Sequence, residues 1–202
     1  MLSIEESLQR FEELHGDVCP GQILGVRMAV LGCKLIGIED PRGLDRKKLV
    51  VWVEIDRWLA DAVEVVTGAR LGKRNLKFRD YGKLAATFLN LENGDAVRVV
   101  ALGSSRELAR QRHPEIEDKH LRQLTTYREA TDEELFGVRT VQMTLNELDA
   151  PGHPKARVNC SDCEEEINDG REVITSDGGI KCQPCALAAR DHTIVSRVMS
   201  TR

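Results

Sequence analysis

Aromatic residues are scarce in this sequence, so its interior has to be built from aliphatic side chains. Phe, Trp and Tyr together make up 4% of the 202 residues, whereas hydrophobic residues of all kinds make up 41%. This hydrophobic fraction, together with 31% charged residues, is typical of a soluble globular protein. A chain of this length predicts one domain of ordinary size with a small module attached.

The sequence also lacks an excess of positive charge. Its formal net charge is −4, from 29 Lys and Arg against 33 Asp and Glu. The charge is spread evenly: residues 1–150 carry 22 against 25, a net −3, and residues 151–202 carry 7 against 8, a net −1. Nucleic-acid-binding proteins usually have a basic excess, because neutralising phosphates releases counterions. The charge balance therefore argues against a nucleic-acid partner.

Long apolar runs are missing as well. No stretch approaches the roughly 20 apolar residues that cross a bilayer, and no charged start precedes an apolar segment in the manner of a secretory signal. We therefore expect a cytoplasmic protein with no membrane association. In that compartment the six cysteines are expected to be free, metal-bound or catalytic rather than disulfide-bonded.

The apolar residues that are present follow patterns of both helices and strands. The predicted helices cover residues 3–14, 22–37 and 58–68, and the predicted strands cover 49–55, 75–78, 84–91, 96–102 and 138–145. Turn residues such as Asn93-Gly94-Asp95 join several neighbouring strands directly. We therefore expect an α+β fold, with helices packed on a mixed or antiparallel sheet, rather than a doubly wound sheet.

Local signals place some helix ends. The helix over 22–37 is apolar nearly all round, which predicts that it is buried and that it stops at Gly37. Capping-box spacing, a serine or threonine followed three residues later by a glutamate, occurs at Ser3/Glu6, Ser104/Glu107 and Thr131/Glu134.

Four cysteines near the C-terminus have the spacing of a structural zinc site. Two CxxC pairs, separated by 18 residues, are formed by Cys160, Cys163, Cys182 and Cys185. The Asp177-Gly178-Gly179 turn between the pairs predicts a hairpin, and the residues after the second pair are helical in pattern. We expect a treble-clef-like finger over 151–202, joined to an α+β core over 1–150 by a linker at 149–157. The alternative is two redox-active pairs without metal.

Residues 15–21, HGDVCPG, raise the question of a second site. They place His15 and Cys19 at the break between two helices. One interpretation is a packed turn. Another is a mixed metal site in the core, completed by Asp56 or Asp61 and keeping an open coordination position. In a third, Cys19 is a nucleophile whose thiolate is favoured by His15.

A basic segment follows the third predicted helix. GARLGKRN, residues 68–75, is not a phosphate-binding P-loop, because only three residues separate its glycine from Gly-Lys, and no Ser or Thr follows. What remains is a cluster of cations: Arg70, Lys73, Arg74, Lys77, Arg79 and Lys83. It could bind an anionic cofactor, such as a pterin with a carboxylate- or phosphate-bearing tail. The alternative is a solvated basic face balanced by nearby acids.

Similarity to a known family is carried by three stretches: FEELHGDVCPGQILGVRMAVL, VEIDRWLADAVEVVTGARLGKRNLKFRDYGKLAATF and GDAVRVV. Together they resemble the FmdE family of formylmethanofuran dehydrogenase subunits, in the form with an auxiliary C-terminal zinc finger. The resemblance covers roughly residues 8–145 and the tail. It implies an α+β core, a homodimer and a site around His15 and Cys19. To that site it adds Glu54 and Asp56, with candidate ligand-binding residues Lys73, Asn75, Arg79 and Lys83.

The sequence departs from this family at two positions. Members generally carry one cysteine two residues after the aspartate of the E-x-D segment and another just after the TG dipeptide. Here these positions are Trp58 and Ala69. The departures imply that a thiolate-rich centre in the core has been dismantled.

Three functions are compatible with these observations. The first is an accessory or regulatory protein, related to the FmdE component of molybdenum or tungsten formylmethanofuran dehydrogenase, with its finger docking to a protein. The second is a small metal- or thiol-dependent enzyme centred on His15, Cys19 and Asp56. The third is a nucleic-acid-binding regulator, which requires these basic residues to share one face: Lys155, Arg157, Arg171 and Lys181. We favour the first, because the sequence holds no ferredoxin-type cysteine motif that could carry the redox chemistry.

Overall fold

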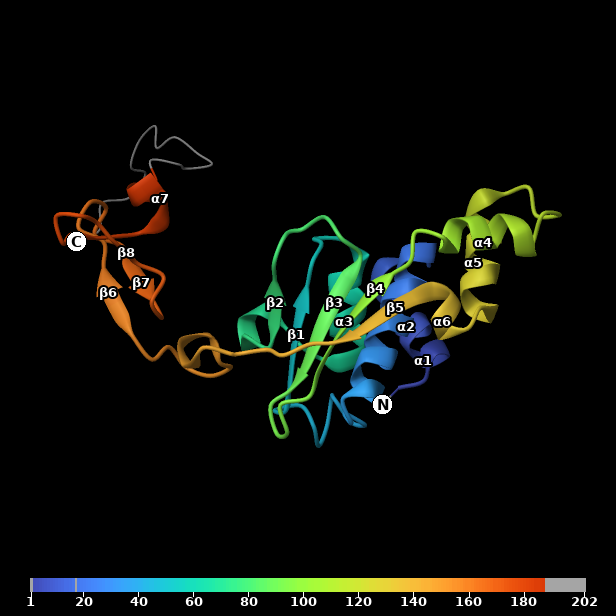
Figure 1. Ribbon diagram of the computed structural model, residues 1–202, viewed down its shortest axis with the longest axis horizontal. Coiled ribbons are helices and arrows are strands. Elements are labelled where there is room, and N and C mark those ends of the chain that lie inside the picture. Colours follow the sequence, from blue (N-terminus) through green and yellow to red (C-terminus); the bar gives the residue numbers. More distant parts are fainter. Residues whose placement is uncertain (1, 17, 188–202) are drawn as a thin grey trace. The chain divides into compact units, whose positions relative to one another are not determined.

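The computed structural model describes residues 2–16 and 18–187, which form two compact units (Figure 1). The chain divides after Thr144, and each unit is described by itself. The sequence-based boundary between 150 and 151 stays a prediction; the structure assigns the preceding residues 145–150 to the second unit. None of the helices in the described part of the chain is both long and apolar enough to cross a membrane.

The first unit consists of helices packed on one sheet. Its helices are α1 (Ile4–His15), α2 (Pro20–Leu35), α3 (Trp58–Thr67), α4 (Ser105–Arg112), α5 (Lys119–Glu129) and α6 (Asp132–Leu135), with a 3-10 turn η1 (Leu71–Lys73). Its strands are β1 (Leu49–Val53), β2 (Leu76–Phe78), β3 (Ala85–Asn90), β4 (Ala96–Ala101) and β5 (Phe136–Thr140). They form one sheet in the order β2-β1-β3-β4-β5.

The sheet is mixed, as predicted. β1 and β2 are parallel, whereas the pairs β1–β3, β3–β4 and β4–β5 are antiparallel. The α+β class expected from the sequence is therefore confirmed. The last strand differs from its prediction over 138–145, because it begins at Phe136 and ends at Thr140. Its partner β4 begins at Ala96, whose carbonyl accepts the N–H of Val141. Residues after Val141 therefore have no residue of β4 left to pair with.

Two of the three predicted capping boxes are present. Those at Ser3/Glu6 and Thr131/Glu134 have both reciprocal hydrogen bonds. The prediction at Ser104 is wrong: its backbone is already helical, with φ −64° and ψ −17°, and its side chain makes no cap hydrogen bond. Glu107 instead pairs with Arg110, at 2.9 Å.

Helix α2 is the buried centre of this unit, as its apolar sequence predicts. It begins at Pro20, two residues earlier than expected, because proline suits the first position of a helix. At its other end Gly37 has φ 70°, and the N–H of Ile38 donates to the Cys33 carbonyl at 2.9 Å. Figure 1 shows α2 and α3 on the same face of the sheet.

Glycine residues allow α2 to approach its neighbours closely. A Cβ added at Gly25 would lie 2.7 Å from the Cβ of Ala62 on α3. One added at Gly32 would overlap the ring of Phe88 on β3. The contacts between α2, α3 and the sheet therefore depend on the missing side chains at these two positions.

A buried arginine holds α2 against the end of α5. Arg27 is 8% exposed. Its Nη1 donates to the carbonyls of Tyr127 at 2.9 Å and Ala130 at 2.6 Å, and its Nη2 donates to Asp132 Oδ1 at 2.6 Å. The guanidinium thus satisfies carbonyl groups that a helix C-terminus leaves without intrahelical partners.

The second unit is a small module of short strands. Its elements are η2 (Glu147–Asp149), β6 (Arg157–Asn159), β7 (Glu166–Asn168), β8 (Val173–Ile174), β9 (Ile180–Lys181) and α7 (Gln183–Leu187). β6 pairs with β7 and β8 pairs with β9, both antiparallel. The turn at Asp177–Gly179 lies between β8 and β9, as predicted; the rest of the predicted C-terminal helix, from residue 188 onward, lies outside the described residues.

We predict that Gly32→Ala destabilises the first unit. Overpacking a well-filled core costs about 1–3 kcal/mol, more than the roughly 0.5–1 kcal/mol that alanine gains over glycine in a helix. The free energy of unfolding, measured by urea denaturation, should fall by about 1 kcal/mol or more. Gly21→Ala is the matched control, because a Cβ there meets its neighbours at ordinary distances of 3.5 and 3.7 Å. Equal stability of the two variants would contradict the prediction.

We also predict a pH dependence from His113, which lies between two carboxylates after α4. Its Nε2 is 2.9 Å from Glu129 and its Nδ1 is 3.1 Å from Glu115. The hydrogen bond to Glu129, and then that to Glu115, raises the pKa of His113 above 6.5. The two interactions of protonated His113 therefore stabilise the fold fully below about pH 6.5, the pKa of histidine in the unfolded chain. This stabilisation is lost as the pH rises through the higher pKa of His113 in the folded state.

The test is the free energy of unfolding as a function of pH, for the wild type and for His113→Gln. The wild type should be the more stable at low pH, and the difference should shrink as the pH rises through the neutral range. A difference that does not change with pH would show that the imidazolium does not stabilise the fold.

Candidate functional site

The four cysteines of the two CxxC pairs lie together in the second unit. Their Sγ atoms all lie within 4.8 Å of one another, and those of Cys163 and Cys182 are 3.9 Å apart. Four sulfur atoms around one tetrahedral zinc ion, each about 2.3 Å from the ion, lie roughly 3.8 Å from each other. The spacing of these thiols therefore fits a single tetrahedral metal ion.

Hydrogen bonds between the two short turns bring these sulfur atoms together. Cys160 follows β6, and its carbonyl accepts the N–H of Glu164 at 2.9 Å in a tight turn. The N–H of Ser161 donates to the carbonyl of Ile180 at 2.8 Å, which places the first turn beside β9. Cys182 follows β9, and its N–H donates to the Sγ of Cys160 at 3.3 Å. The order of turn, hairpin and helix α7 is the order that the sequence predicts.

The surroundings of the cluster lower the pKa of one thiol and raise the pKa of two others. Backbone N–H groups of Cys163 and then Cys182 lower the pKa of Cys160 to about 6. The N–H of Glu165 lowers the pKa of Cys163, but burial and the neighbouring thiols outweigh it and raise that pKa to about 12. The pKa of Cys182 is also raised. The N–H of Cys185 lowers it, but burial and the neighbouring thiols of Cys185 and Cys160 outweigh this effect. Four adjacent thiolates repel one another, so their full ionisation requires a cation, whose binding releases protons.

The HGDVCPG turn joins the first two helices of the core. α1 ends at His15, and Gly16 follows it with φ 88°. α2 begins directly after Cys19, whose N–H donates to Oε1 of Gln22 at 2.5 Å. Cys19 is half-buried. The side chain of His15 and the whole of Asp17 lie outside the described residues.

The side chains of Trp58 and Cys19 both lie near Gly21. A Cβ at Gly21 would lie 3.5 Å from Trp58 Cδ1 and 3.7 Å from the Sγ of Cys19, so both side chains reach the same glycine. Trp58 is 50% exposed, whereas Ala69 is fully buried in the core. At the two positions where the resemblance implies cysteines, this chain therefore has an aromatic ring and a methyl group.

The predicted acidic ligands lie close to α3 but do not complete a site among the described side chains. Asp56 is exposed before α3, and Asp61 is half-buried in its first turn. Across the side chains that the structure describes, the four-cysteine cluster is the one group of three or more His, Cys, Asp or Glu ligands close enough to share an ion. The side chain of His15 is not among them, so its role with Cys19 and Asp56 stays a prediction.

Glu54 follows the last residue of β1 and is bound by neighbouring residues of the core. Its carboxylate accepts two hydrogen bonds from Arg98 on β4, at 2.6 and 2.7 Å. Its carbonyl accepts the N–H groups of Tyr81 and Lys83, both at 3.1 Å. Glu54 is 6% exposed, so it ties the segment after β2 to the sheet.

The predicted ligand-binding residues of the basic segment differ in their surroundings. Asn75 is 8% exposed, and its Oδ1 accepts the backbone N–H of Arg70 at 3.0 Å. It therefore orders the chain that precedes β2. Lys73, Arg79 and Lys83 are exposed. Binding of an anionic ligand by these four residues stays a prediction.

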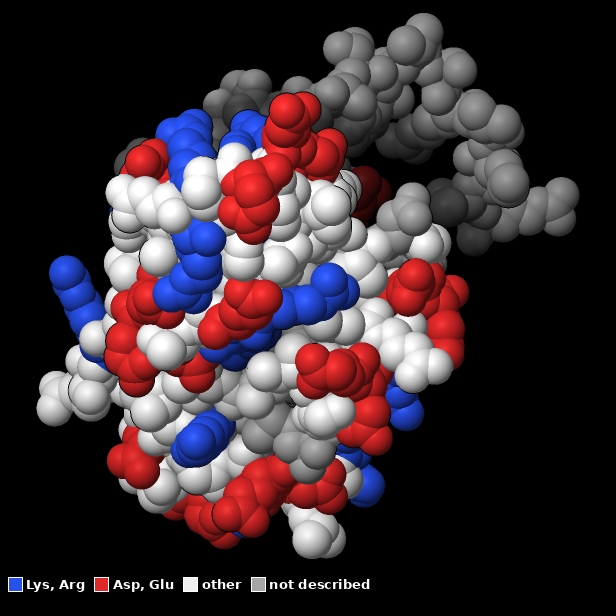
Figure 2. Space-filling view, turned by 90° about the vertical axis from the view of Figure 1, so that its right-hand side faces the viewer, with Lys and Arg blue, Asp and Glu red and all other residues white. Residues whose placement is uncertain are grey.

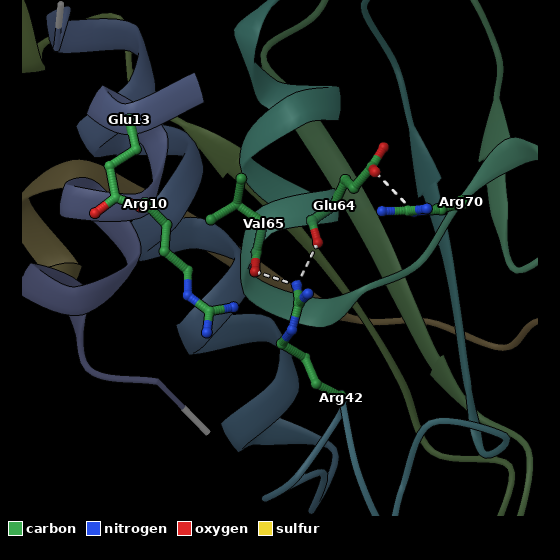
Figure 3. A pocket seen from close by; sticks show the side chains of 6 residues that line it. All are labelled: Arg10, Glu13, Arg42, Glu64, Val65 and Arg70. Carbon is green, nitrogen blue, oxygen red and sulfur yellow. Dashed lines mark hydrogen bonds and ion pairs between the residues drawn. The ribbon is translucent and has the colours of Figure 1, made fainter. Parts of the chain in front are cut away.

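A cavity that no sequence motif indicates lies between α1 and α3. Its volume is about 350 Å³, and it is lined by Arg10, Glu13, Arg42, Glu64, Val65 and Arg70 (Figure 3). The three arginines come from α1, from the loop before β1 and from the segment after α3. Because these segments are far apart in the sequence, no spacing rule could have found the cavity.

The fold and the two sites define a two-part protein, with an α+β core and a four-cysteine module. The family described as "FmdE, Molybdenum formylmethanofuran dehydrogenase operon" matches residues 14–137. The chain belongs to this family, and the resemblance seen in the sequence is confirmed.

A solved structure has the same fold. It is the crystal structure of a tungsten formylmethanofuran dehydrogenase FmdE-like protein from Syntrophus aciditrophicus, which this chain matches with a TM-score of 0.60 and 22% sequence identity. The match covers 93% of this chain and 94% of that one.

A curated relative shares a shorter stretch. It is a probable S-adenosyl-L-methionine-binding protein from Archaeoglobus fulgidus, 38% identical over 93 residues. The match covers 46% of this chain and 25% of the relative, so the similarity spans about a quarter of the relative's length.

We predict that Arg98→Met destabilises the core, because it leaves the carboxylate of Glu54 buried without its partner. Removing one member of a buried pair costs about 3 kcal/mol. Arg139→Met is the control, since Arg139 lies opposite Arg98 on β5 and is exposed. Urea denaturation should give a large loss for Arg98→Met, a small one for Arg139→Met, and partial recovery when Glu54→Gln is added to Arg98→Met. Equal losses for the two arginine variants would contradict the structural role of the pair.

Proposed function

We propose that this chain is a zinc-binding accessory protein of the FmdE family, whose four-cysteine cluster holds one structural zinc ion. The observation that carries this proposal is the mutual approach of the four Sγ atoms, all within 4.8 Å. Tetrahedral coordination by four sulfur ligands is typical of zinc or iron–sulfur sites. The arrangement of two CxxC pairs around a hairpin favours zinc, and four thiolates leave no open position for a substrate.

The accessory role is supported by the core. In the proposal, the HGDVCPG turn holds no metal, because Trp58 lies beside Cys19 where the family resemblance implies a further thiol. Ala69 replaces the other expected thiol and is enclosed by apolar side chains. A core of this kind would bind or position a partner instead of carrying out redox chemistry.

Exposed apolar side chains on the finger support a protein partner. Ile174 is 73% exposed and Leu187 is 70% exposed, and both belong to the small second unit. A protein partner that covered these side chains would remove them from water. We propose that the finger docks to another protein, that the core forms a homodimer as in the family resemblance, and that the protein acts in the cytoplasm. A small anionic ligand of the basic segment would bind through Lys73, Arg79 and Lys83, positioned by the backbone that Asn75 orders.

The four basic residues of the finger that the structure describes are paired with acidic neighbours, which argues against nucleic acid as the partner. The pairs are Lys155–Glu147 at 3.8 Å, Arg157–Glu166 at 3.6 Å, Arg171–Asp149 at 2.7 Å and Lys181–Asp162 at 2.9 Å. On the face that Figure 2 shows, basic side chains likewise lie among acidic ones. A phosphate backbone would have to compete with these carboxylates.

The alternative function is a small metal- or thiol-dependent enzyme centred on His15, Cys19 and Asp56. It differs from the accessory role in one measurable way, since it requires a reactive thiol or a second metal ion in the core.

Metal stoichiometry tests the proposal directly. We would purify the full chain, a Cys160→Ser/Cys163→Ser variant and a Cys19→Ser variant without chelators and determine their metals by elemental analysis. We expect one zinc ion per wild-type chain, loss of that ion in the double variant, and its retention in Cys19→Ser, because the four Sγ ligands lie only in the finger.

Two outcomes would overturn parts of this proposal. Zinc that is retained in the double variant, or a cluster occupied by iron, would refute the structural zinc site. A second metal ion that is lost in Cys19→Ser would show that HGDVCPG binds metal and would favour the enzyme. Circular dichroism of the variants shows whether the core stays folded while the finger loses its metal.

A further inference from the structure

The cavity between α1 and α3 concentrates positive charge that the fold does not fully use. Three arginines and two glutamates line it (Figure 3). One of the glutamates, Glu64, is already engaged, because its Oε1 lies 2.8 Å from Nε of Arg70. The remaining lining is dominated by the guanidinium groups of Arg10 and Arg42, facing each other across the cavity.

Arg42 is held in place by the end of α3. Its Nη1 donates to the carbonyl groups of Glu64 at 3.0 Å and Val65 at 2.6 Å. A Cβ at Gly68 would lie 3.6–3.8 Å from atoms of Arg42, so the side chain lies along this glycine, whose φ is 69°. These contacts fix the guanidinium through Nη1, and Arg42 is one of the residues that line the cavity.

Arg70 is positioned through its backbone. Its N–H donates to the buried side chain of Asn75, and its carbonyl accepts the N–H groups of Lys73 at 3.1 Å and Leu76 at 3.3 Å. The segment after α3 is therefore held in a defined conformation, and Arg70 extends from it along the rim of the cavity. Its Nε pairs with Glu64, and 58% of its side chain is exposed.

Arg10 is the arginine whose position packing does not explain. It is exposed on α1, and its side chain makes no hydrogen bond or ion pair with any residue that the structure describes. Burial, and then repulsion from Arg10 and Arg70, lowers the pKa of Arg42. Arg10 and Arg70 thus both repel Arg42, Glu64 attracts it, and an anion beside Arg42 would offset the repulsion.

We propose that this cavity is a binding site for an oxyanion, the phosphate or carboxylate group of a small ligand, held by Arg10 and Arg42 with Arg70 at the rim. A guanidinium presents a planar fork of N–H donors that matches phosphate and carboxylate oxygens. Glu13 has no partner drawn in Figure 3 and could accept a hydrogen bond from a hydroxyl or amino group elsewhere on the same ligand. The site shares Arg70 with the basic segment, but its other lining residues belong neither to that segment nor to the zinc cluster.

The test is isothermal titration calorimetry of the full chain with inorganic phosphate and, separately, with succinate, at constant ionic strength. Arg10→Gln is the decisive variant, because the side chain of Arg10 makes no hydrogen bond or ion pair with a described residue; within α1 it also attracts Glu6, whose pKa it helps to lower. Arg106→Gln is its matched control: Arg106 is an exposed arginine on another helix, α4, and its replacement changes the net charge equally. Arg79→Gln reports on the basic segment.

We expect saturable binding of at least one of the two anions, weakened about tenfold or more by Arg10→Gln, since this is the effect of losing a hydrogen bond to a charged group. Arg106→Gln and Arg79→Gln should bind as the wild type does. Binding of phosphate alone would identify a phosphate-bearing ligand, and binding of succinate alone a carboxylate.

Three results would overturn the proposal: no saturable binding of either anion, equal weakening by Arg10→Gln and Arg106→Gln, or loss of binding with Arg79→Gln only. The last would place the anion site on the basic segment. The Cys160→Ser/Cys163→Ser variant should retain anion binding, so this inference and the zinc site can fail independently.

Discussion

The close approach of α2 to its neighbours is the constraint on which the core depends. Gly25 lies against Ala62 of α3, and Gly32 lies against the ring of Phe88 on β3. Without Cβ atoms at these positions, helix and sheet pack at a distance that no larger residue allows. The gain in packing outweighs the low helix propensity of glycine, about 1 kcal/mol relative to alanine. With α2 fixed in this way, the position of α3 on the sheet follows.

The same packing sets the surroundings of both core sites. The first turn of α2 lies beside the start of α3. The side chain of Trp58 therefore lies close to Gly21, as the Sγ of Cys19 also does. The last turn of α3 offers carbonyl groups to Arg42, and α1 brings Arg10 to the same place. Helix α3 thus has Trp58 close to Gly21 at its beginning and the arginine-lined cavity at its end.

The finger follows a different physical principle. Its strands are two or three residues long and bury few apolar side chains, so a hydrophobic core alone gives it little stability. Four close thiols, which need a cation to ionise together, couple the folding of such a module to metal binding. The CxxC pairs made this chemistry visible in the sequence, because both turns obey a local spacing rule. The α+β class, the buried helix α2 and two of the capping boxes were predictable for the same reason.

Features that depend on contacts between distant segments were not predictable. The end of β5 depends on where β4 begins, and the helical backbone of Ser104 prevents the capping box that its spacing suggests. The burial of the Asn75 side chain, whose Oδ1 accepts the N–H of Arg70, is another such feature. The arginine cavity joins three segments that share no motif. Local chemistry, in the cysteine spacing and the hydrophobic period, was therefore determined by the sequence itself. The neighbours of each polar side chain were decided by tertiary packing, because charges from distant segments meet only once helices and sheet are in place.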